Sequence, residues 1–441
     1  MKLKDRLSSS RIIILGFMAA ILTGTVLLML PVSAKSGTYT SFSDALFTAT
    51  SAACVTGLVV EDTASYWSMF GQLVILLLIQ AGGMGIVTSA AMIAIISGRR
   101  IDLKQRSTMM DALSAPSVGG IVRLTGFILK VSLSAEALGA VLLMPRFIKE
   151  EGILKGIWYS VFHSVSAFCN AGFDLMGSHS RFSSFTAYSS DIWMNVVLMM
   201  LIIAGGIGFL TWDDIRVNRT KVKKYRMQTK VVLTVASVLI SVSAVYFFFF
   251  EFGSLPMKER ILVSLFQSVT PRTAGFNTAD MASLSETGCL ITVFLMLVGG
   301  SPGSTAGGMK MTTLAVIVST AASVFKRRES TQFFGRRISD KTVRTAVAIL
   351  AIYLFLFITG GVIISRTEGL PLADCLFETA SAVGTVGLTL GMTPSLGACS
   401  RWILVVLMFL GRVGGLTIIY SAFSGPSRTL SKPPVEKITV G

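Results

Sequence analysis

A short stretch of sequence recurs four times along the chain, and it constrains the fold more than any other feature. Each copy runs from a phenylalanine through Ser/Thr-rich residues to a glycine that precedes Leu or Phe. The copies occupy residues 47–58, 162–173, 266–276 and 377–388, and the third is one residue shorter than the others. Their glycines are separated by 115, 103 and 112 residues. A fixed period of this kind indicates repeated structural units, so we predict four units in the 441 residues.

The composition of the chain places these units in a membrane. Hydrophobic residues make up 52% of the chain and charged residues only 14%, whereas a soluble domain is typically about 25% charged. Several apolar runs are long enough to cross a hydrocarbon core about 30 Å thick as helices. The net charge of +16 does not indicate nucleic-acid binding, because the basic residues lie in segments between the apolar runs.

The four units have the same predicted order of elements. A first span is followed by the Phe-to-Gly stretch, a second span and a basic connector. The Phe-to-Gly stretch is too short and too polar to span, and non-helical backbone at membrane depth requires surrounding protein or a watery cavity. We therefore predict an all-α membrane protein with eight spans and four re-entrant pore helices and loops. The first spans are predicted at 12–31, 120–144, 229–251 and 344–364, the second spans at 70–96, 191–212, 289–322 and 401–423, and the repeats at 1–106, 107–226, 227–340 and 341–441 with a cytoplasmic tail.

The first apolar run has an alternative interpretation as a secretory signal peptide. Val32-Ser33-Ala34 resembles a cleavage site. The run extends over about 19 residues, which exceeds the usual apolar region of a signal peptide. It also lies where the repeat requires its first helix, so we favour a membrane span.

The positions of the basic residues indicate the orientation of the spans. Of the 39 Lys and Arg residues, 25 lie in the N-terminal segment, the three connectors and the C-terminal segment. Cytoplasmic loops carry an excess of these residues, so we predict cytoplasmic termini and re-entrant stretches that enter from outside a cell membrane. Contact with lipid headgroups accounts for most of this charge, and docking of an acidic cytoplasmic partner is the alternative.

An even number of spans in each unit gives all four units the same orientation. Such repeats are related by an axis along the membrane normal, whereas the inverted repeats of many coupled transporters need an odd number of spans. We therefore predict four parallel M1–pore helix–M2 repeats around a pseudo-fourfold central pore in one chain.

The four stretches end in residues suited to a carbonyl-lined filter. A potassium filter replaces the water shell of the ion with carbonyl oxygens, and its known sequence is TVGYG; residues 385–387 are its first three letters. Glycine adopts backbone angles closed to residues with a Cβ. A single glycine has an alternative role in helix packing, but four at equivalent places favour a filter. The predicted ion-filter residues are Val55, Thr56, Gly57, Asn170, Ala171, Gly172, Thr273, Ala274, Gly275, Thr385, Val386 and Gly387.

Charged residues are rare near the predicted filter. Carboxylates do not occur at equivalent positions of all four repeats, which favours selection by carbonyls over an acidic ring. Arg272 and Glu378 each occur in a single repeat. We expect both to form structural salt bridges or hydrogen bonds behind the filter.

The second span of the third unit is predicted to be broken and to carry the gate. Five glycines and one proline in the ten residues 299–308 are incompatible with a regular helix. Arg412 stands where the other second spans have glycine, and a charge at that depth requires a partner. We predict that Arg412 latches the loop across the pore; a static brace between helices is the alternative. The predicted gate residues are Gly299, Gly300, Ser301, Pro302, Gly303, Ser304, Thr305, Ala306, Gly307, Gly308, Lys310 and Arg412.

Motifs for other chemistry are absent from the sequence. A phosphate-binding loop built on Gly303 and Gly308 would need Lys at position 309, where the chain has Met309. The five cysteines and two histidines show no metal-ligand spacing, and we expect the cysteines to be small buried side chains. We therefore predict a protein that is not an enzyme and that binds no cofactor.

The four repeated stretches, QSVTPRTAGFNT (267–278) and GGSPGSTAGGMK (299–310) resemble the Trk/Ktr/HKT superfamily of cation transporters, and the Ktr-type potassium-translocating subunit in particular. The resemblance covers about residues 12–425. It implies that Gly57, Gly172, Gly275 and Gly387 bind potassium, and that the broken span and its arginine form a gate. Some plant relatives have Ser at the first filter position and favour sodium, so Gly57 indicates potassium.

The resemblance also implies partners that the sequence itself does not show. These are a cytosolic ring of nucleotide-binding regulatory subunits and a second copy of this chain in a homodimer. We predict potassium-selective uptake through the filter, with sodium as a conceivable activator. The alternatives are a coupled potassium/sodium symporter and a less selective sodium- and potassium-permeable transporter.

Overall fold

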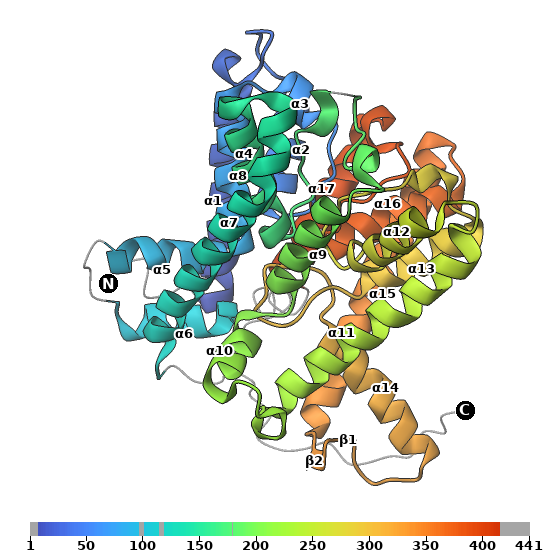
Figure 1. The fold of residues 1–441 in the computed structure, drawn as a ribbon. Helices are drawn as coiled ribbons and strands as arrows, with labels where there is room; N and C mark the ends of the chain where they lie inside the picture. The colour runs from blue at the N-terminus through green and yellow to red at the C-terminus, as the bar shows by residue number, and fades with distance from the viewer. Residues whose placement is uncertain (1–7, 97–100, 114–118, 179, 415–441) are drawn as a thin grey trace.

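The computed structural model describes residues 8–96, 101–113, 119–178 and 180–414. Four long helices organise this part of the chain, and each is apolar enough to cross a membrane. They are α1 (Ser9–Met29), α7 (Ile121–Glu151), α11 (Met227–Tyr246), which continues as the π-helix η6 (Phe247–Glu251), and α15 (Asp340–Glu368). They match the four predicted first spans (Figure 1). The first of them, α1, packs against α2 and α4.

Four shorter helices coincide with the repeated Phe-to-Gly stretches. They are α2 (Phe42–Ala53), α8 (Ile153–Cys169), α12 (Met257–Val269) and α16 (Leu372–Gly384). Each contacts the long helix that precedes it in the chain. Phe47, Phe162, Phe266 and Phe377, which begin the four copies of the motif, have no exposed surface. These phenylalanines therefore anchor the short helices to the surrounding spans.

The second spans of the first two units are not continuous helices. The helix α4 (Met69–Gly83) is followed by α5 (Ile86–Ile96) at a bend of 97°, and α9 (Ile192–Gly206) is followed by α10 (Phe209–Asn218) at a bend of 95°. We predicted breaks only in the third unit, so the structure corrects the prediction for the first two. The cause is Gly85 and Gly208, whose φ angles of +84° and +89° are incompatible with a continuing right-handed helix.

The third and fourth units differ from the first two. The second span of the third unit is divided into α13 (Glu286–Leu297) and α14 (Met311–Phe325), as predicted, with residues 298–310 between them. In the fourth unit α17 runs over Ala398–Val413, and the rest of the predicted span and the cytoplasmic tail lie outside the described residues.

Short elements connect these helices. The helix α6 (Leu103–Leu113) crosses the predicted boundary after residue 106, whereas α11 begins at the predicted boundary after 226. The three boundaries between the repeats stay predictions. A two-stranded antiparallel hairpin precedes α15. The remaining elements are α3 (Thr63–Tyr66), β1 (Gln332–Phe333), β2 (Arg336–Arg337), η2 (Pro31–Ser33), η3 (Met176–Ser178), η4 (Thr186–Tyr188), η5 (Val222–Lys224), η7 (Met281–Ser283) and η8 (Thr393–Ser395).

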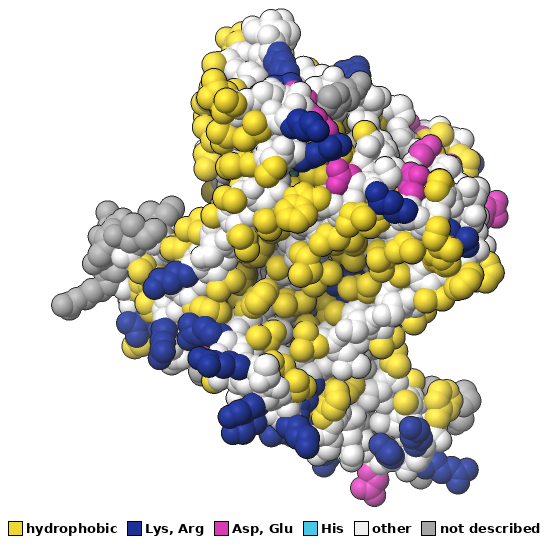
Figure 2. Space-filling model, viewed as in Figure 1, with side chains coloured by type: hydrophobic (Ala, Val, Ile, Leu, Met, Phe, Trp, Pro, Cys, Tyr) yellow, Lys and Arg dark blue, Asp and Glu magenta, His cyan; other side chains and the backbone are white. Residues whose placement is uncertain are grey.

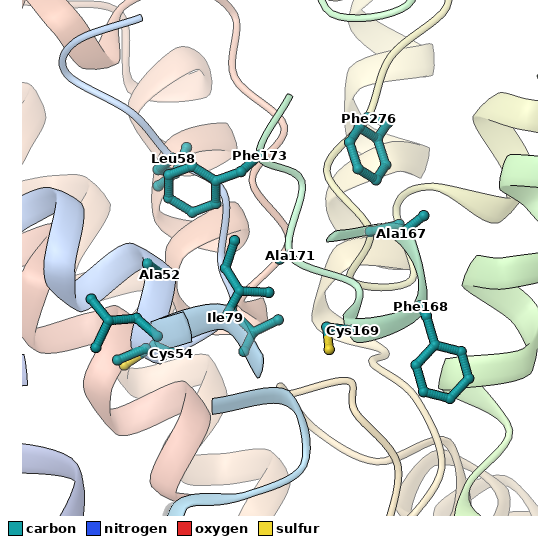
Figure 3. Close-up of a cluster of buried hydrophobic side chains, with 14 of the residues drawn as sticks. Ala52, Cys54, Leu58, Ile79, Ala167, Phe168, Cys169, Ala171, Phe173 and Phe276 are labelled. Carbon is teal, nitrogen blue, oxygen red and sulfur yellow. The ribbon is translucent and has the colours of Figure 1, made fainter. Parts of the chain in front are cut away.

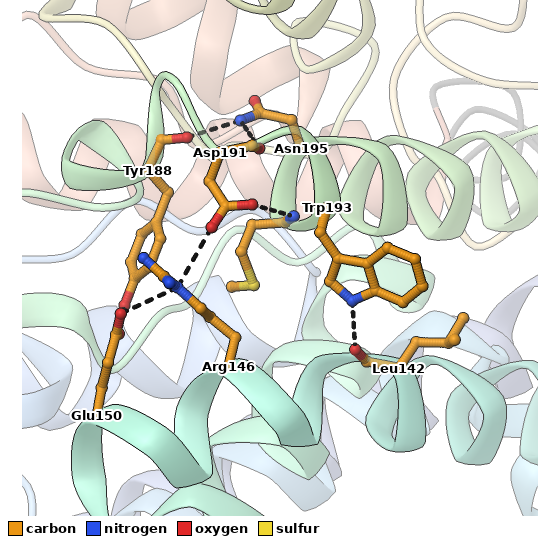
Figure 4. A network of polar contacts seen from close by, with 8 residues as sticks. Leu142, Arg146, Glu150, Tyr188, Asp191, Trp193 and Asn195 are labelled. Atoms are coloured by element: carbon orange, nitrogen blue, oxygen red, sulfur yellow. Dashed lines mark hydrogen bonds and ion pairs between the residues drawn. The ribbon is translucent and has the colours of Figure 1, made fainter.

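A polar network joins one end of α7 to the start of α9 (Figure 4). The Arg146 guanidinium lies 3.0 Å from the Glu150 carboxylate and 3.2 Å from that of Asp191. The indole N–H of Trp193 donates to the carbonyl oxygen of Leu142 over 2.7 Å. The arginine is 40% exposed, so these ion pairs position the two helices more than they stabilise them.

Candidate functional site

The four repeated glycines form a closed ring. A Cβ added to Gly57 would lie 2.5 Å from the carbonyl oxygen of Ala171 and 3.0 Å from the Cα of Gly172. In the same way, a Cβ added to Gly172 would meet the third repeat, and one added to Gly275 would meet the fourth. A Cβ added to Gly387 would lie 2.2 Å from the carbonyl oxygen of Thr56, which closes the ring at the first repeat. Segments more than 100 residues apart in sequence therefore surround one axis in the order of the repeats, without room for side chains at the glycines.

The backbone of the four segments follows one pattern. In every repeat the first and third of the three predicted filter residues have positive φ, and the second does not. Glycine tolerates this conformation at the third position. Val55, Thr273 and Thr385 are β-branched residues for which positive φ is unusual and costly, and such strain clusters at functional sites. The φ angles are +57° and +92° at Val55 and Gly57, +58° and +70° at Asn170 and Gly172, +75° and +79° at Thr273 and Gly275, and +51° and +95° at Thr385 and Gly387.

The Ser or Thr four residues after each motif phenylalanine holds this backbone in place. The amide N–H of Gly57 donates to the Ser51 hydroxyl over 3.0 Å, and Thr56 donates to the Ser51 carbonyl over 2.8 Å. Ser381 holds Val386 and Gly387 at the same distances. In the second repeat the Ser166 carbonyl accepts from Ala171, and its hydroxyl donates to the carbonyl of Phe173. The amides of these segments thus donate hydrogen bonds to serines of the short helices that precede them.

The third repeat reaches the same geometry with one residue fewer. The Ala274 amide donates to the carbonyl of Thr270, which lies four residues earlier. In the other three repeats the corresponding hydrogen bond joins residues that are five apart. The Thr270 hydroxyl donates to the carbonyl oxygen of Phe276 over 2.5 Å. A tighter turn therefore absorbs the missing residue, and Gly275 still joins the ring.

Apolar side chains surround the ring. The residues that follow the glycines are at most 1% exposed, namely Leu58, Phe173, Phe276 and Leu388. Figure 3 shows the first three of these, with Cys54 and Cys169 at the ends of their pore helices. Within the described residues the buried hydroxyls of Thr56 and Thr385 have no hydrogen-bond partner. Polar groups without partners in an otherwise apolar shell are suited to contact with water or a cation.

The predicted gate residues form a loop that packs against the ends of the pore helices. It is closed at its base where the Gly299 amide donates to the Met309 carbonyl over 2.7 Å and Met311 donates to Gly300 over 3.1 Å. A Cβ added to Gly307 would lie 2.0 Å from the Thr385 hydroxyl. The loop therefore lies directly against the filter segment of the fourth repeat.

The loop is also tied to the second unit. The Ser301 amide donates to the Gly206 carbonyl over 2.9 Å, and the Thr305 hydroxyl donates to the Phe168 carbonyl over 3.0 Å. Phe209 donates its amide to the carbonyl of Gly303 over 2.8 Å. The bonds of Gly206 and Phe209 use a carbonyl and an amide freed by the bend between α9 and α10, and the Phe168 carbonyl lies at the end of α8. The two broken spans therefore complete each other's backbone hydrogen bonding.

Arg412 joins this loop to the first unit. Its guanidinium donates to the carbonyls of Thr305 and Gly82, and to that of Gly83 over 3.2 Å. The Lys310 ammonium instead donates within the loop, to Ala306 over 2.7 Å and Gly307 over 3.3 Å. Sequence reasoning anticipated the loop as the partner of Arg412 but missed the acceptors on α4, because a carbonyl freed by a helix bend leaves no sequence signal.

A cavity of about 600 Å³ lies on the far side of the loop from the glycine ring. Its wall includes Phe17, Met84, Lys310, Tyr353 and Arg412. The loop thus borders both the fourth repeat's segment, at Thr385, and this cavity.

Arg272 and Glu378 form hydrogen bonds behind the ring, as predicted. The Glu378 carboxylate accepts from the hydroxyls of Thr389 and Thr393 and from the amide of Leu390. The Arg272 guanidinium donates to the Ala236 carbonyl over 3.3 Å. These residues tie the loop after the fourth filter segment and the pore helix of the third repeat to neighbouring elements.

Glu136 is a buried carboxylate that sequence reasoning missed. It is 5% exposed, and both its oxygens accept from the Gln80 amide over 2.9 and 3.0 Å. The Ser164 hydroxyl donates to its backbone carbonyl over 2.6 Å. The signal that would have found it is a single acidic residue within the apolar run 120–144.

Comparisons with known proteins agree with this architecture. The solved potassium transporter TrkH of Vibrio parahaemolyticus superposes with a TM-score of 0.75 at 19% identity, covering 97% of this chain and 87% of that one, which shows a shared fold. The chain is 39% identical to the potassium/sodium uptake protein NtpJ of Enterococcus hirae, over 100% of this chain and 99% of the relative. It is 38% identical to the Ktr system potassium uptake protein B of Bacillus subtilis, over 98% and 97%.

The match extends to a family model. The model described as a cation transport protein, TrkH, matches residues 6–432. It therefore includes all four copies of the glycine motif, the loop 299–308 and Arg412. The chain belongs to the TrkH family of cation transport proteins.

Proposed function

We propose that this chain takes up potassium across the cell membrane through the ring of glycines. The observation that carries the proposal is the closed ring itself, in which the backbones of four repeats meet with no side chains between them. Backbone carbonyls arranged around an axis replace the hydration shell of potassium in known filters. The names of the Bacillus subtilis and Enterococcus hirae relatives, which both include potassium uptake, support the same ion.

In this proposal the ion binds at Gly57, Gly172, Gly275 and Gly387. The amides held by Ser51, Ser166 and Ser381 are directed to the pore helices, which leaves the carbonyls of the segments to face the ion. The buried hydroxyls of Thr56 and Thr385, which have no hydrogen-bond partner within the described residues, are additional oxygen groups one and two residues before the ring glycines. A hard monovalent cation is suited to such an oxygen-lined site.

The loop 299–308 is the proposed gate. It lies between the ring and the 600 Å³ cavity, and the donation from Arg412 to Thr305 and Gly82 fixes it to two units at once. Ions leaving the filter would have to displace the loop. Release of the arginine contacts is the proposed opening step.

We also propose a separate cytosolic regulatory subunit, a ring of nucleotide-binding chains, and a homodimer of this chain, with both termini cytoplasmic. These proposals rest on the family resemblance. The Bacillus subtilis relative is named as part of a Ktr system, which is consistent with a transporter of more than one component.

The second candidate function is the movement of sodium together with potassium. The relative from Enterococcus hirae is named a potassium/sodium uptake protein, which favours either a coupled symporter or a filter that passes both ions. Sodium as an activator of potassium uptake is a third arrangement. The parallel repeats favour a filter over a rocking symporter.

Ion flux into liposomes that contain the purified chain tests both candidates. A potassium gradient should drive flux that sodium at equal concentration does not reduce, and the reversal potential should follow the potassium equilibrium potential. Equal passage of sodium and potassium would reject potassium selectivity. A reversal potential displaced by a fixed sodium stoichiometry would favour the symporter.

A further inference from the structure

A small basic cavity lies outside the ring and gate. It has a volume of about 300 Å³ and is enclosed by the first turn of α7, by α10 and by the start of α11. Three exposed arginines line it, namely Arg123, Arg216 and Arg226. None of these arginines contributes to the ion path described above, so their convergence requires another explanation.

The charges of this cavity are not balanced by the protein. Asp213 is the carboxylate in its wall, 3.8 Å from the Arg216 guanidinium. The neighbouring Asp214 carboxylate accepts from the backbone amide of Arg226 and the side-chain amide of Asn218, each over 2.8 Å, and forms no ion pair with a guanidinium in the described part of the chain. Within the described residues Arg123 and Arg226 form no ion pair. The cavity is therefore positively charged.

The geometry of the cavity is suited to a phosphate group. Arginine presents several N–H donors in a plane that matches phosphate oxygens, and such charge-assisted hydrogen bonds are strong. The Arg216 guanidinium lies over the Phe127 ring, 4.5 Å from its centre, which fixes its orientation. The helix α7 begins at Gly120 without a side-chain cap, and the partial positive charge of its N-terminus adds to the field.

The apolar part of the wall indicates where the phosphate comes from. Leu124, Phe127, Leu210 and Val217 line the cavity beside the arginines, and α7 continues from it as a span. Figure 2 shows Lys and Arg gathered along the lower edge of the molecule, below a broad apolar surface. A cavity in which arginines and apolar side chains lie next to one another, at the first turn of a membrane span, fits the headgroup and upper chains of a lipid better than a free anion.

We propose that this cavity binds the phosphate of an anionic phospholipid, with Arg123, Arg216 and Arg226 as its ligands. The lipid lies against α7 and α10, and its acyl chains follow Phe127 along the outside of the bundle. The proposal does not depend on the ion that the ring conducts. It does place the second and third units in contact with a lipid of the leaflet that faces the basic edge.

The test is native mass spectrometry of the purified chain with phosphatidylglycerol. The variant Arg123→Gln/Arg216→Gln/Arg226→Gln should bind this lipid at least tenfold more weakly than the unmodified chain. The matched control is Arg328→Gln/Arg336→Gln/Arg337→Gln, which removes three exposed arginines near the hairpin before α15. The control should retain binding. The variant Arg123→Lys/Arg216→Lys/Arg226→Lys should bind with intermediate affinity, because lysine keeps the charge but not the planar donors.

Three outcomes would overturn the proposal. Unchanged phosphatidylglycerol binding by the Gln variant would show that the cavity is not a lipid site. An equal loss of phosphatidylglycerol binding in the control variant would show that binding depends on the general positive charge of the surface and not on this cavity. Displacement of the lipid by millimolar glycerol phosphate or inorganic phosphate would make the cavity a site for soluble anions. A symmetric size-exclusion peak for each variant establishes that it is folded.

Discussion

Gly387 shows how one residue determines the geometry of the ring. Its φ is +95°, and a Cβ would lie 2.2 Å from the carbonyl oxygen of Thr56 in the first repeat. Conformational strain and a backbone clash therefore act on the same residue. Gly391, four residues later, has a similar φ of +93° but nothing within 4 Å of an added Cβ.

The pair of variants Gly387→Ala and Gly391→Ala separates these effects. We expect Gly387→Ala to lower potassium flux roughly tenfold or more and to reduce selectivity over sodium, since strain and displacement cost on the order of 1–3 kcal/mol. Gly391→Ala should retain most of the flux. Potassium flux into liposomes is measured for both variants. Equal losses of flux would show that backbone strain alone, and not the close contact within the ring, causes the loss in Gly387→Ala.

Glu136 is expected to contribute to stability through Gln80. Glu136→Ala removes the acceptor of a buried amide, and we expect a decrease of about 1–3 kcal/mol in the free energy of unfolding. Glu136→Gln keeps an acceptor oxygen and should cost less. Thermal unfolding in detergent measures both variants. A Gln variant as unstable as the Ala variant would show that the negative charge, rather than the hydrogen bond, stabilises this site.

Asp174 is expected to make cation entry depend on pH. It lies two residues beyond Gly172, outside the spanning helices, and its removal from water raises the pKa of its carboxyl to about 7. Asp174 is therefore neutral below pH 7 and negative above it. Raising the external pH from 6 to 8 should lower the potassium concentration for half-maximal flux by a few-fold. Asp174→Asn should remove most of this dependence, and an unchanged pH profile would contradict it.

At the scale of elements, the sequence predicted the long helices better than the bent ones. Periodic phenylalanines and apolar runs identify the first spans and pore helices because burial and length are local properties. The bends after Gly83 and Gly206 were missed because a glycine pair is also typical of packed membrane helices. What distinguishes the bends is Gly85 and Gly208, each two residues beyond the pair. Beside Gly208, the amide of Phe209 donates to the carbonyl of Gly303 in another unit, a partner that the local sequence does not reveal.

The glycine ring was also only partly predictable, because its backbone conformation depends on contacts that the local sequence does not reveal. The four segments could be located because their copies share a pattern, and the structure brings all four together; that their twelve residues form an ion filter stays a prediction. The left-handed conformation of Val55, Asn170, Thr273 and Thr385 could not, since none of these residue types requires it. It becomes intelligible only with the bonds from Ser51, Ser166, Thr270 and Ser381.

Substitution of Arg412 tests whether this residue is a latch that holds the gate closed or a static brace between helices. If the loop is a gate, Arg412→Ala removes charge-assisted bonds to two units, each worth about 1.5–3 kcal/mol, and flux without any regulator should rise. The control is Arg401→Ala on the same helix, which removes a 2.7 Å ion pair with Asp44 far from the loop. Lower thermal stability of the Arg412 variant with unchanged flux would establish the brace instead.

At the scale of the molecule, membership of the TrkH family confirms the prediction of a multi-pass cation transporter that is not an enzyme. The proposed orientation can be tested on the unmodified chain. Cys399, at the start of α17, is the exposed one of the five free cysteines. A membrane-impermeant maleimide should label it in intact cells, and Cys399→Ser should abolish the signal. Labelling that requires permeabilised cells would reverse the proposed topology.

The ring of glycines is built from one polypeptide, and this affects how it can change during evolution. In a pore assembled from four identical subunits, each substitution appears at four positions simultaneously. Here Gly57, Gly172, Gly275 and Gly387 are encoded separately, so a substitution alters one quarter of the ring and leaves three quarters intact. Ion preference can therefore shift in small steps, one repeat at a time.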